Sequence, residues 1–181
     1  MIPFATPGQW NAWLAANPTA TEVWVLFHKK ASDLPSITWE EAVIEALAHG
    51  WIDGVKKSLN ETSYIQRFTP RRAGSAWSQK NIQHAENLIK TGRMTDAGLR
   101  HVNLAKENGR WDTAYSGGKG ADVPQDFLDA LPTAAKAHYA TLDAKNRYAI
   151  YYRLTTAKRP QTRAKRMADF IEKLSKGADI L

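Results

Sequence analysis

Cationic side chains cluster with aromatic residues in the middle of the sequence, and this combination is suited to binding an anion. Lys56 and Lys57 precede three closely spaced arginines, Arg67, Arg71 and Arg72. The guanidinium group is a planar fork of hydrogen-bond donors that matches the oxygens of carboxylate and phosphate. Over residues 51–100, nine Lys or Arg stand against four Asp or Glu. We therefore predict that these cations form an anion-binding site.

Aromatic and polar residues beside the same arginines predict the walls of a pocket. The predicted wall residues are Trp51, Asp53, Tyr64, Phe68 and Trp77. Their ring faces are able to stack on a base or another flat group. The alternative is that the rings belong to the core and that the arginines form ion pairs with Asp53, Glu61 or Glu86.

Residues for catalysis or metal binding form no comparable group. An acid–base pair of Asp53 with His28 or His49 comes nearest, with the arginines holding a substrate anion. The absence of cysteine excludes thiolate zinc sites, disulfides and a cysteine nucleophile. The histidines and carboxylates show no metal-ligand spacing, so we expect neither a metal nor a cofactor. An enzymatic role is the less favoured interpretation.

A second basic stretch lies at residues 151–181, with eight Lys or Arg against three Asp or Glu. A helix is predicted to open at Pro160 and to run through Leu174, with Ala164, Met167 and Ile171 along one side. A basic helix can bind nucleic-acid backbone or anionic lipid, but its apolar stripe is also what packing requires. Core packing with solvated charge is the favoured interpretation.

The segment that carries the candidate site is predicted to be a β-hairpin. Two β-prone runs, 51–58 and 63–69, flank a four-residue loop. In that register Arg67 lies opposite Gly54 on one face, and the four predicted wall residues of the hairpin lie on the other face, namely Trp51, Asp53, Tyr64 and Phe68. A slip by one residue would reverse these relations.

The remaining periodicities complete an α+β fold, with a small antiparallel sheet covered by helices and a helical carboxy-terminal part. A buried strand is predicted over 22–28, and Thr38 with Glu41 forms a capping box for a helix over 39–49 that buries Trp39. Further helices are predicted over 7–16, 79–90, 96–107, 125–131, 133–139, 143–156 and 160–174. The predicted organisation is an α+β domain over 1–115, a glycine-rich linker over 116–123 and a helical domain over 124–181.

Several motifs together resemble the YdeI/OmpD-associated, or bacteriocin-protection, family over nearly the whole chain. The matching segments are VWVLFHKK (23–30), ITWEEA (37–42), GWIDGVK (50–56), YIQRFTPRR (64–72), WSQKN (77–81), GRMT (92–95) and TAKRP (156–160). The resemblance implies a bacterial protein linked to resistance against bacteriocins or cationic antimicrobial peptides. It implies no reaction and no catalytic residue.

These observations predict a non-catalytic binding protein whose partner is an anionic small molecule or an acidic macromolecule. Nucleic acid is a less favoured partner, and the sequence indicates no oligomeric state. No run approaches the roughly 18 apolar residues of a membrane helix, and the first residues lack the pattern of a signal peptide. We therefore expect no transmembrane segment and a cytoplasmic location.

Overall fold

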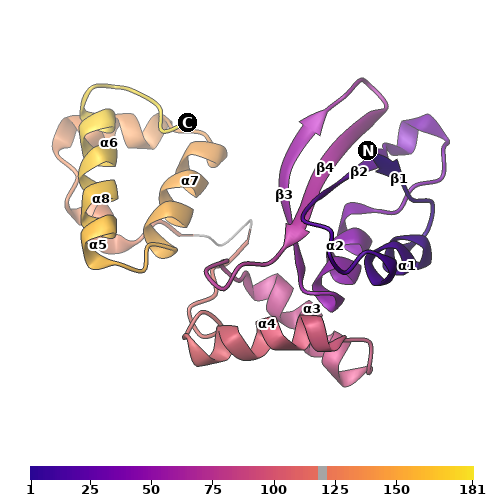
Figure 1. Cartoon of the computed structure of the whole chain (residues 1–181). Helices are drawn as coiled ribbons and strands as arrows, with labels where there is room; N and C mark the ends of the chain where they lie inside the picture. The colour runs from indigo at the N-terminus through magenta and orange to yellow at the C-terminus, as the bar shows by residue number, and fades with distance from the viewer. Residues whose placement is uncertain (118–121) are drawn as a thin grey trace. The chain divides into compact units, whose positions relative to one another are not determined.

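Figure 1 shows a computed structural model of the chain, which describes residues 1–117 and 122–181. The chain forms two compact units, unit 1 at Met1–Ala114 and unit 2 at Tyr115–Leu181. Unit 1 contains the whole sheet and unit 2 is helical, so the prediction of an α+β fold is confirmed. Part of the predicted linker over 116–123 lies outside the described residues.

Unit 1 is built on a four-stranded sheet with the order β1-β2-β4-β3. The strands are β1 (Ile2–Pro3), β2 (Val23–His28), β3 (Trp51–Ser58) and β4 (Ser63–Pro70). β4 pairs antiparallel with both β2 and β3, as a hairpin beside a buried strand requires. β1 was not predicted, because a two-residue strand has no periodicity; it pairs parallel with β2.

The hairpin register departs from a regular ladder at a β-bulge. Asp53 lies opposite Phe68 in the predicted register, but Lys56 lies opposite Gln66, so the pairing shifts by one residue between Asp53 and Lys56. A bulge of this kind places an extra residue on one strand and changes which side chains share a face. The predicted register is therefore correct at the base of the hairpin and wrong by one residue near its turn.

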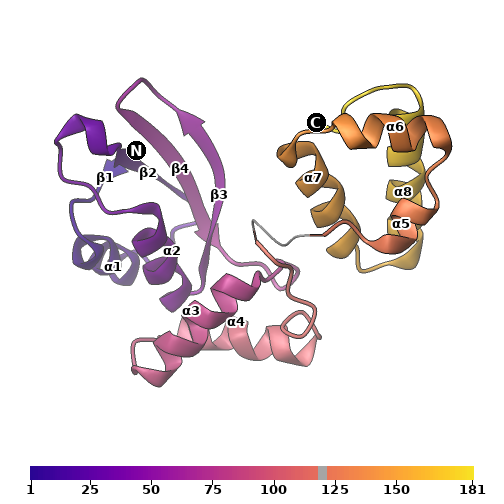
Figure 2. The same ribbon diagram turned by 180° about the vertical axis from the view of Figure 1, so that it is seen from behind.

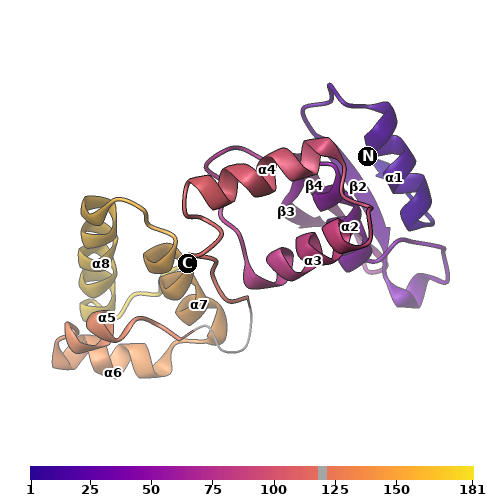
Figure 3. The same cartoon turned by 90° about the horizontal axis from the view of Figure 1, so that it is seen from below.

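Four helices accompany the sheet. They are α1 (Pro7–Ala16), α2 (Trp39–Ala48), α3 (Gln79–Lys90) and α4 (Asp96–Glu107), and a short 3-10 turn, η1, covers Lys30–Ser32. The predicted capping box of α2 is present, with the Glu41 amide donating to Thr38 Oγ1 and the Thr38 amide donating to Glu41 Oε2. Figures 1 and 3 show α3 and α4 at the end of the sheet where β3 begins and β4 ends.

The core of unit 1 lies between α1, α2 and one face of the sheet. Trp10 and Phe68 are fully buried and meet edge to face, and Trp10 Nε1 donates to the Ala42 carbonyl. α4 approaches the end of α2 so closely that a Cβ at Gly98 would lie 2.5 Å from the Ala48 carbonyl oxygen. Glycine is therefore required at this crossing, which holds the end of α2 against α4.

Unit 2 consists of α5 (Gln125–Asp129), α6 (Thr133–Thr141), α7 (Ala144–Thr155) and α8 (Pro160–Ser175). α8 contacts both α6 and α7, and Figure 2 shows α7 and α8 on opposite sides of the unit. Its core includes Phe127, Ile150 and Leu174. The Asn146 side-chain oxygen accepts from the amides of Ile180 and Leu181, so the segment after α8 is fixed against α7.

Most element predictions agree with the structure to within two residues. Among the described residues, no helix combines the length and the apolar character that crossing a membrane requires.

Candidate functional site

The structure distributes the three predicted arginines over different environments. Arg71 is buried, its Nη2 donates to the Ala76 carbonyl at 2.8 Å and its guanidinium stacks on Trp77 at 3.9 Å. Arg67 lies on the opposite face of β4 from Phe68 and is 3.6 Å from Glu22. Arg72 is exposed in the turn that follows β4. These guanidinium groups do not share one surface.

The two predicted lysines are separated in the same way. Lys56 Nζ lies 3.8 Å from the centre of the Tyr64 ring, whereas Lys57 Nζ lies 4.9 Å from the centre of the Trp24 ring. Tyr64 and Trp24 belong to opposite faces of the sheet. The structure therefore brings together Lys56 and Tyr64, and leaves Lys57 with Arg67 on the other face.

Three of the predicted wall residues belong to the core. Trp51, Phe68 and Trp77 are at most 4 % exposed. Their surfaces are occupied by packing, as the alternative interpretation of the sequence anticipated. Asp53 and Tyr64 are only partly buried, and they lead to a pocket that the sequence did not indicate.

This pocket, which we call the Trp39 pocket, has a volume of about 370 Å³. It lies between the end of β2, the segment before α2 and the first turn of α2. Its lining includes Lys29, Lys30, Leu34, Thr38, Trp39 and Tyr64. A pocket of this size accommodates a small organic molecule.

Trp39 forms a fixed and partly exposed wall of the pocket. The prediction that α2 buries this residue is wrong: Trp39 is 41 % exposed, because it is the first residue of the helix and lies beyond the core stripe. Its Nε1 donates to Asp53 Oδ2 at 3.2 Å, and Gln66 Nε2 donates to the same oxygen at 3.0 Å. The indole ring is thus held in one orientation while its surface remains open.

Burial raises the pKa of the Asp53 carboxyl above its ordinary value. The hydrogen bond from Trp39 and the charge of Arg71 act in the opposite direction and favour the carboxylate. No hydrogen bond or ion pair joins Asp53 to His28 or His49 within the described parts of the chain, so the predicted acid–base pair is not assembled. Asp53 instead positions the indole ring.

Tyr64 offers a hydroxyl group to the pocket. Its ring stacks on Phe27 at a centroid distance of 4.9 Å, with Lys56 over its other side. The hydroxyl makes no hydrogen bond with any residue that the structure describes. Burial raises the pKa of Tyr64, so the hydroxyl is protonated at neutral pH and able to donate.

Lysines supply the charge of the pocket. Lys29 Nζ is held by the backbone carbonyls of Asn60 and Glu61, which orient the ammonium group without neutralising it. Within residues 1–117 and 122–181, Lys29, Lys30 and Lys56 form no ion pair. Two acidic residues at the start of α2 are engaged elsewhere, because Glu41 caps α2 and Glu40 pairs with Lys80. The lining of the Trp39 pocket contains Lys29 and Lys30 and no carboxylate, so the lining carries positive charge.

The described residues contain no group of histidine, aspartate and glutamate side chains arranged to hold a metal ion. The pocket chemistry is instead that of stacking, hydrogen bonding and charge. Sequence reasoning missed Trp39, Lys29 and Lys30, although the pair of lysines directly after a buried strand and just before a capped helix was a usable signal.

Comparison with protein families assigns both units. Residues 2–101 match the family described as "Domain of unknown function (DUF8412)". The chain belongs to the DUF8412 family. Residues 120–177 match the family described as "Bacteriocin-protection, YdeI or OmpD-Associated", which confirms the resemblance over that part of the chain. Among the motifs that suggested the resemblance, TAKRP (156–160) falls in this second match, and the others fall within the DUF8412 region.

The Trp39 pocket is formed entirely by residues of the DUF8412 region. Neither a curated protein nor a solved structure matches the chain significantly.

Proposed function

We propose that this DUF8412-family protein is a non-catalytic binding protein whose Trp39 pocket takes an anionic small molecule with a flat, largely apolar part. The observation that carries this proposal is the partly exposed indole ring of Trp39, fixed by Asp53 beside lysines that lack ion-paired carboxylates. An exposed tryptophan held in one orientation gives a stacking surface that loses little conformational entropy on binding.

The pocket determines the class of ligand. Lys29 and Lys30 in the lining, with Lys56 over the ring of Tyr64, favour a negative charge. The Tyr64 hydroxyl donates a hydrogen bond to an oxygen of the ligand. The amino terminus of α2 does not supply this charge, because Glu41 already accepts from the Thr38 amide. Recognition of the anion therefore depends on the lysine side chains.

The name of the family that matches residues 120–177 supports a connection with bacteriocin protection. The protein carries a net charge of +7, which repels a cationic peptide. A protective role is therefore better served by binding an anionic small molecule or an acidic partner than by direct capture of a cationic bacteriocin.

Calorimetric titration of the full chain tests the proposal. The panel contains indole-3-carboxylate, benzoate, nucleoside monophosphates and a short oligonucleotide, each at constant ionic strength and with uncharged counterparts of the small molecules. We expect an aromatic anion to bind more tightly than its neutral counterpart. Because stacking on an aromatic side chain contributes roughly 1–3 kcal/mol, Trp39→Ala should weaken this binding about 5- to 150-fold.

Adjacent lysines give a matched control. Lys56→Met should weaken binding about two- to five-fold, the range of an exposed ion pair, whereas Lys57→Met removes the same charge from the other face and should have little effect. Equal losses in the two variants, or binding of the aromatic carboxylates that is independent of Trp39, would contradict the proposal. Tighter binding of the oligonucleotide, with a steep salt dependence, would favour nucleic acid instead.

A further inference from the structure

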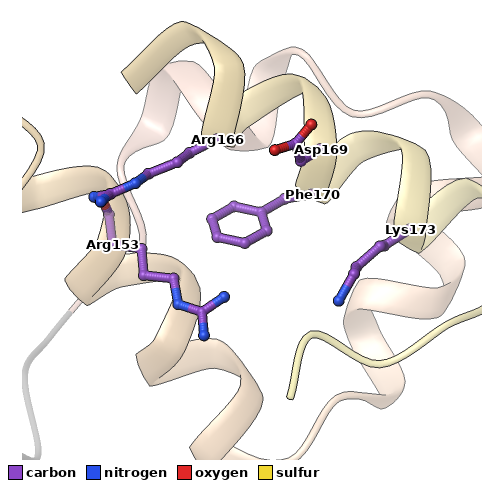
Figure 4. A pocket seen from close by; sticks show the side chains of 5 residues that line it. All are labelled: Arg153, Arg166, Asp169, Phe170 and Lys173. Atoms are coloured by element: carbon purple, nitrogen blue, oxygen red, sulfur yellow. The ribbon is translucent and has the colours of Figure 1, made fainter. Parts of the chain in front are cut away.

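A second hollow, of about 350 Å³, lies within unit 2 between α7 and α8. Its lining consists of Arg153, Arg166, Asp169, Phe170 and Lys173. Figure 4 shows the Arg153 guanidinium and the Lys173 ammonium reaching toward the same open space beside the ring of Phe170, whereas the Arg166 guanidinium is directed to the backbone of α7. We call this hollow the Phe170 pocket.

Helical spacing and tertiary packing together gather these residues. Arg166, Phe170 and Lys173 are separated by four and three residues, so they lie along one side of α8. Phe170 is 4 % exposed and closes the pocket from the core side. Arg153 comes from the last turn of α7 and adds a second guanidinium group from a different helix.

Backbone carbonyls hold two of the three cations in place. Arg166 Nη1 donates to the Arg153 carbonyl at 2.6 Å, and Lys173 Nζ donates to the Ile180 carbonyl at 3.2 Å. The Ile180 segment is itself fixed by Asn146. A carbonyl orients a cation but leaves its charge uncompensated, so both groups remain available to an anion.

The third cation is Arg153. The Arg153 side chain makes no ion pair and no hydrogen bond with the described residues. Asp169 is the one acidic residue in the lining, so the pocket carries three positive charges and one negative charge. A ligand of two negative charges balances this set, and the Asp169 carboxylate is able to accept a hydrogen bond from a hydroxyl group of the same ligand.

From this arrangement we infer that unit 2 contains a binding site for a phosphate monoester of a hydroxyl-bearing small molecule, independent of the Trp39 pocket. Arg153 and Lys173 contact the phosphate dianion, since a guanidinium group pairs with its oxygens through two parallel hydrogen bonds, and Arg166 adds positive charge from the side of α7. Asp169 contacts a hydroxyl of the organic part, and the Phe170 ring excludes water from one side. The same chemistry is offered by a sugar phosphate and by a nucleoside monophosphate.

The experiment is a titration of the full chain at constant ionic strength with ribose 5-phosphate, AMP, ribose, adenosine and inorganic phosphate. Binding is monitored by the NMR chemical shifts of the backbone amides of residues 150–175. Both esters should bind and their unphosphorylated forms should not. Tighter binding of AMP would identify the nucleoside as the preferred source of the phosphate, and tighter binding of ribose 5-phosphate would identify the sugar; both results support the site.

Matched variants distinguish direct contacts with the phosphate from the general attraction of an anion to the positive charge of unit 2. Arg153→Gln should weaken ester binding about tenfold, the lower end of the range for hydrogen bonds to charged groups. Arg159→Gln removes the same charge from the exposed start of α8 and should change it by less than about twofold. Because the exposed Arg153 side chain makes no hydrogen bond or ion pair with the described residues, its replacement should leave the unfolding curve unchanged.

Asp169→Asn supplies an independent check. It removes a negative charge beside the phosphate, so inorganic phosphate should bind about two- to five-fold more tightly, whereas the preference for an ester over inorganic phosphate should decrease. Equal weakening by Arg153→Gln and Arg159→Gln would overturn the inference, as would wild-type binding of inorganic phosphate that equals that of both esters. Trp39→Ala should not affect these titrations, so failure at one pocket is distinguishable from failure at the other.

Discussion

Two basic stretches have a similar excess of positive charge, but the fold separates the cationic side chains of one stretch and brings those of the other to a single hollow. In residues 51–72, Arg71 is buried and the two lysines lie on opposite faces of the sheet. In unit 2, Arg153, Arg166 and Lys173 surround one hollow. The number of charged residues in a stretch of sequence therefore does not determine whether their side chains come together in space. That depends on how elements distant in the chain pack.

The largest expected effect tests whether Arg71 is a structural residue. Arg71→Ala should lower the free energy of unfolding of unit 1 by about 2–4 kcal/mol, because it leaves the partly buried Ala76 carbonyl without its donor and removes packing from Trp77. Arg153→Ala should lower that of unit 2 by less than about 0.5 kcal/mol.

Urea denaturation can measure the two units separately. All seven tryptophans lie in residues 1–114, so tryptophan fluorescence follows unit 1, and circular dichroism at helical wavelengths follows both. Arg71→Lys is the control that retains the charge but not the fork of donors, and it should recover little of the loss. If Arg71→Ala proved as mild as Arg153→Ala, the contrast between the two basic stretches would not hold.

An intermediate effect concerns Asp53. Because burial raises its pKa, the folded state retains a proton at pH values where the unfolded state has lost it. The free energy of unfolding therefore decreases as the pH rises from the ordinary value of 3.8 through the raised pKa. In Asp53→Asn this contribution is absent, while the amide oxygen is still able to accept from Trp39.

The test compares the free energy of unfolding of the wild type with that of Asp53→Asn as a function of pH. The wild type should lose stability relative to Asp53→Asn as the pH rises through this window, when fluorescence-detected unfolding of the two proteins is compared. A constant difference between them across the window would show that Asp53 is not desolvated.

The smallest effect is expected for Arg67, four residues before Arg71 in the same hairpin. Its ion pair with Glu22 spans 3.6 Å between side chains that are 41 % and 50 % exposed. Such pairs contribute about 0–1 kcal/mol, so Arg67→Gln should change the stability of unit 1 by at most about 0.5 kcal/mol, measured by the same fluorescence assay. A loss comparable to that of Arg71→Ala would place Arg67 in the core instead.

Local signals explain why most of the fold could be predicted. The helix α2 begins where Thr38 and Glu41 form a capping box, and the hairpin strands end at the predicted loop. These features depend on residues close together in the sequence. The bulge after Asp53 could not be predicted, because it depends on how β3 meets the rest of the sheet.

The two pockets were harder to predict from the sequence, for a related reason. Trp39 fits the apolar stripe of α2, and only the tertiary position of the helix start leaves it exposed. Arg166, Phe170 and Lys173 were detectable as one helical side, but their partner Arg153 belongs to another helix. Basic residues near aromatic rings are visible in the sequence, whereas the surface on which each lies depends on the packed structure.

Because two lysines are adjacent in β3, the hairpin tolerates a one-residue shift in the pairing of β3 with β4. In the observed ladder Lys56 faces Tyr64 and Lys57 faces Trp24. If the strands slipped by one residue to the regular ladder that lacks the bulge, the lysines would exchange faces, and each ring would still have an ammonium group beside it. The two lysines can therefore replace each other. A shift of β3 by one residue, whether by insertion, deletion or transient misalignment, changes which lysine lies beside Tyr64 but still leaves an ammonium group there.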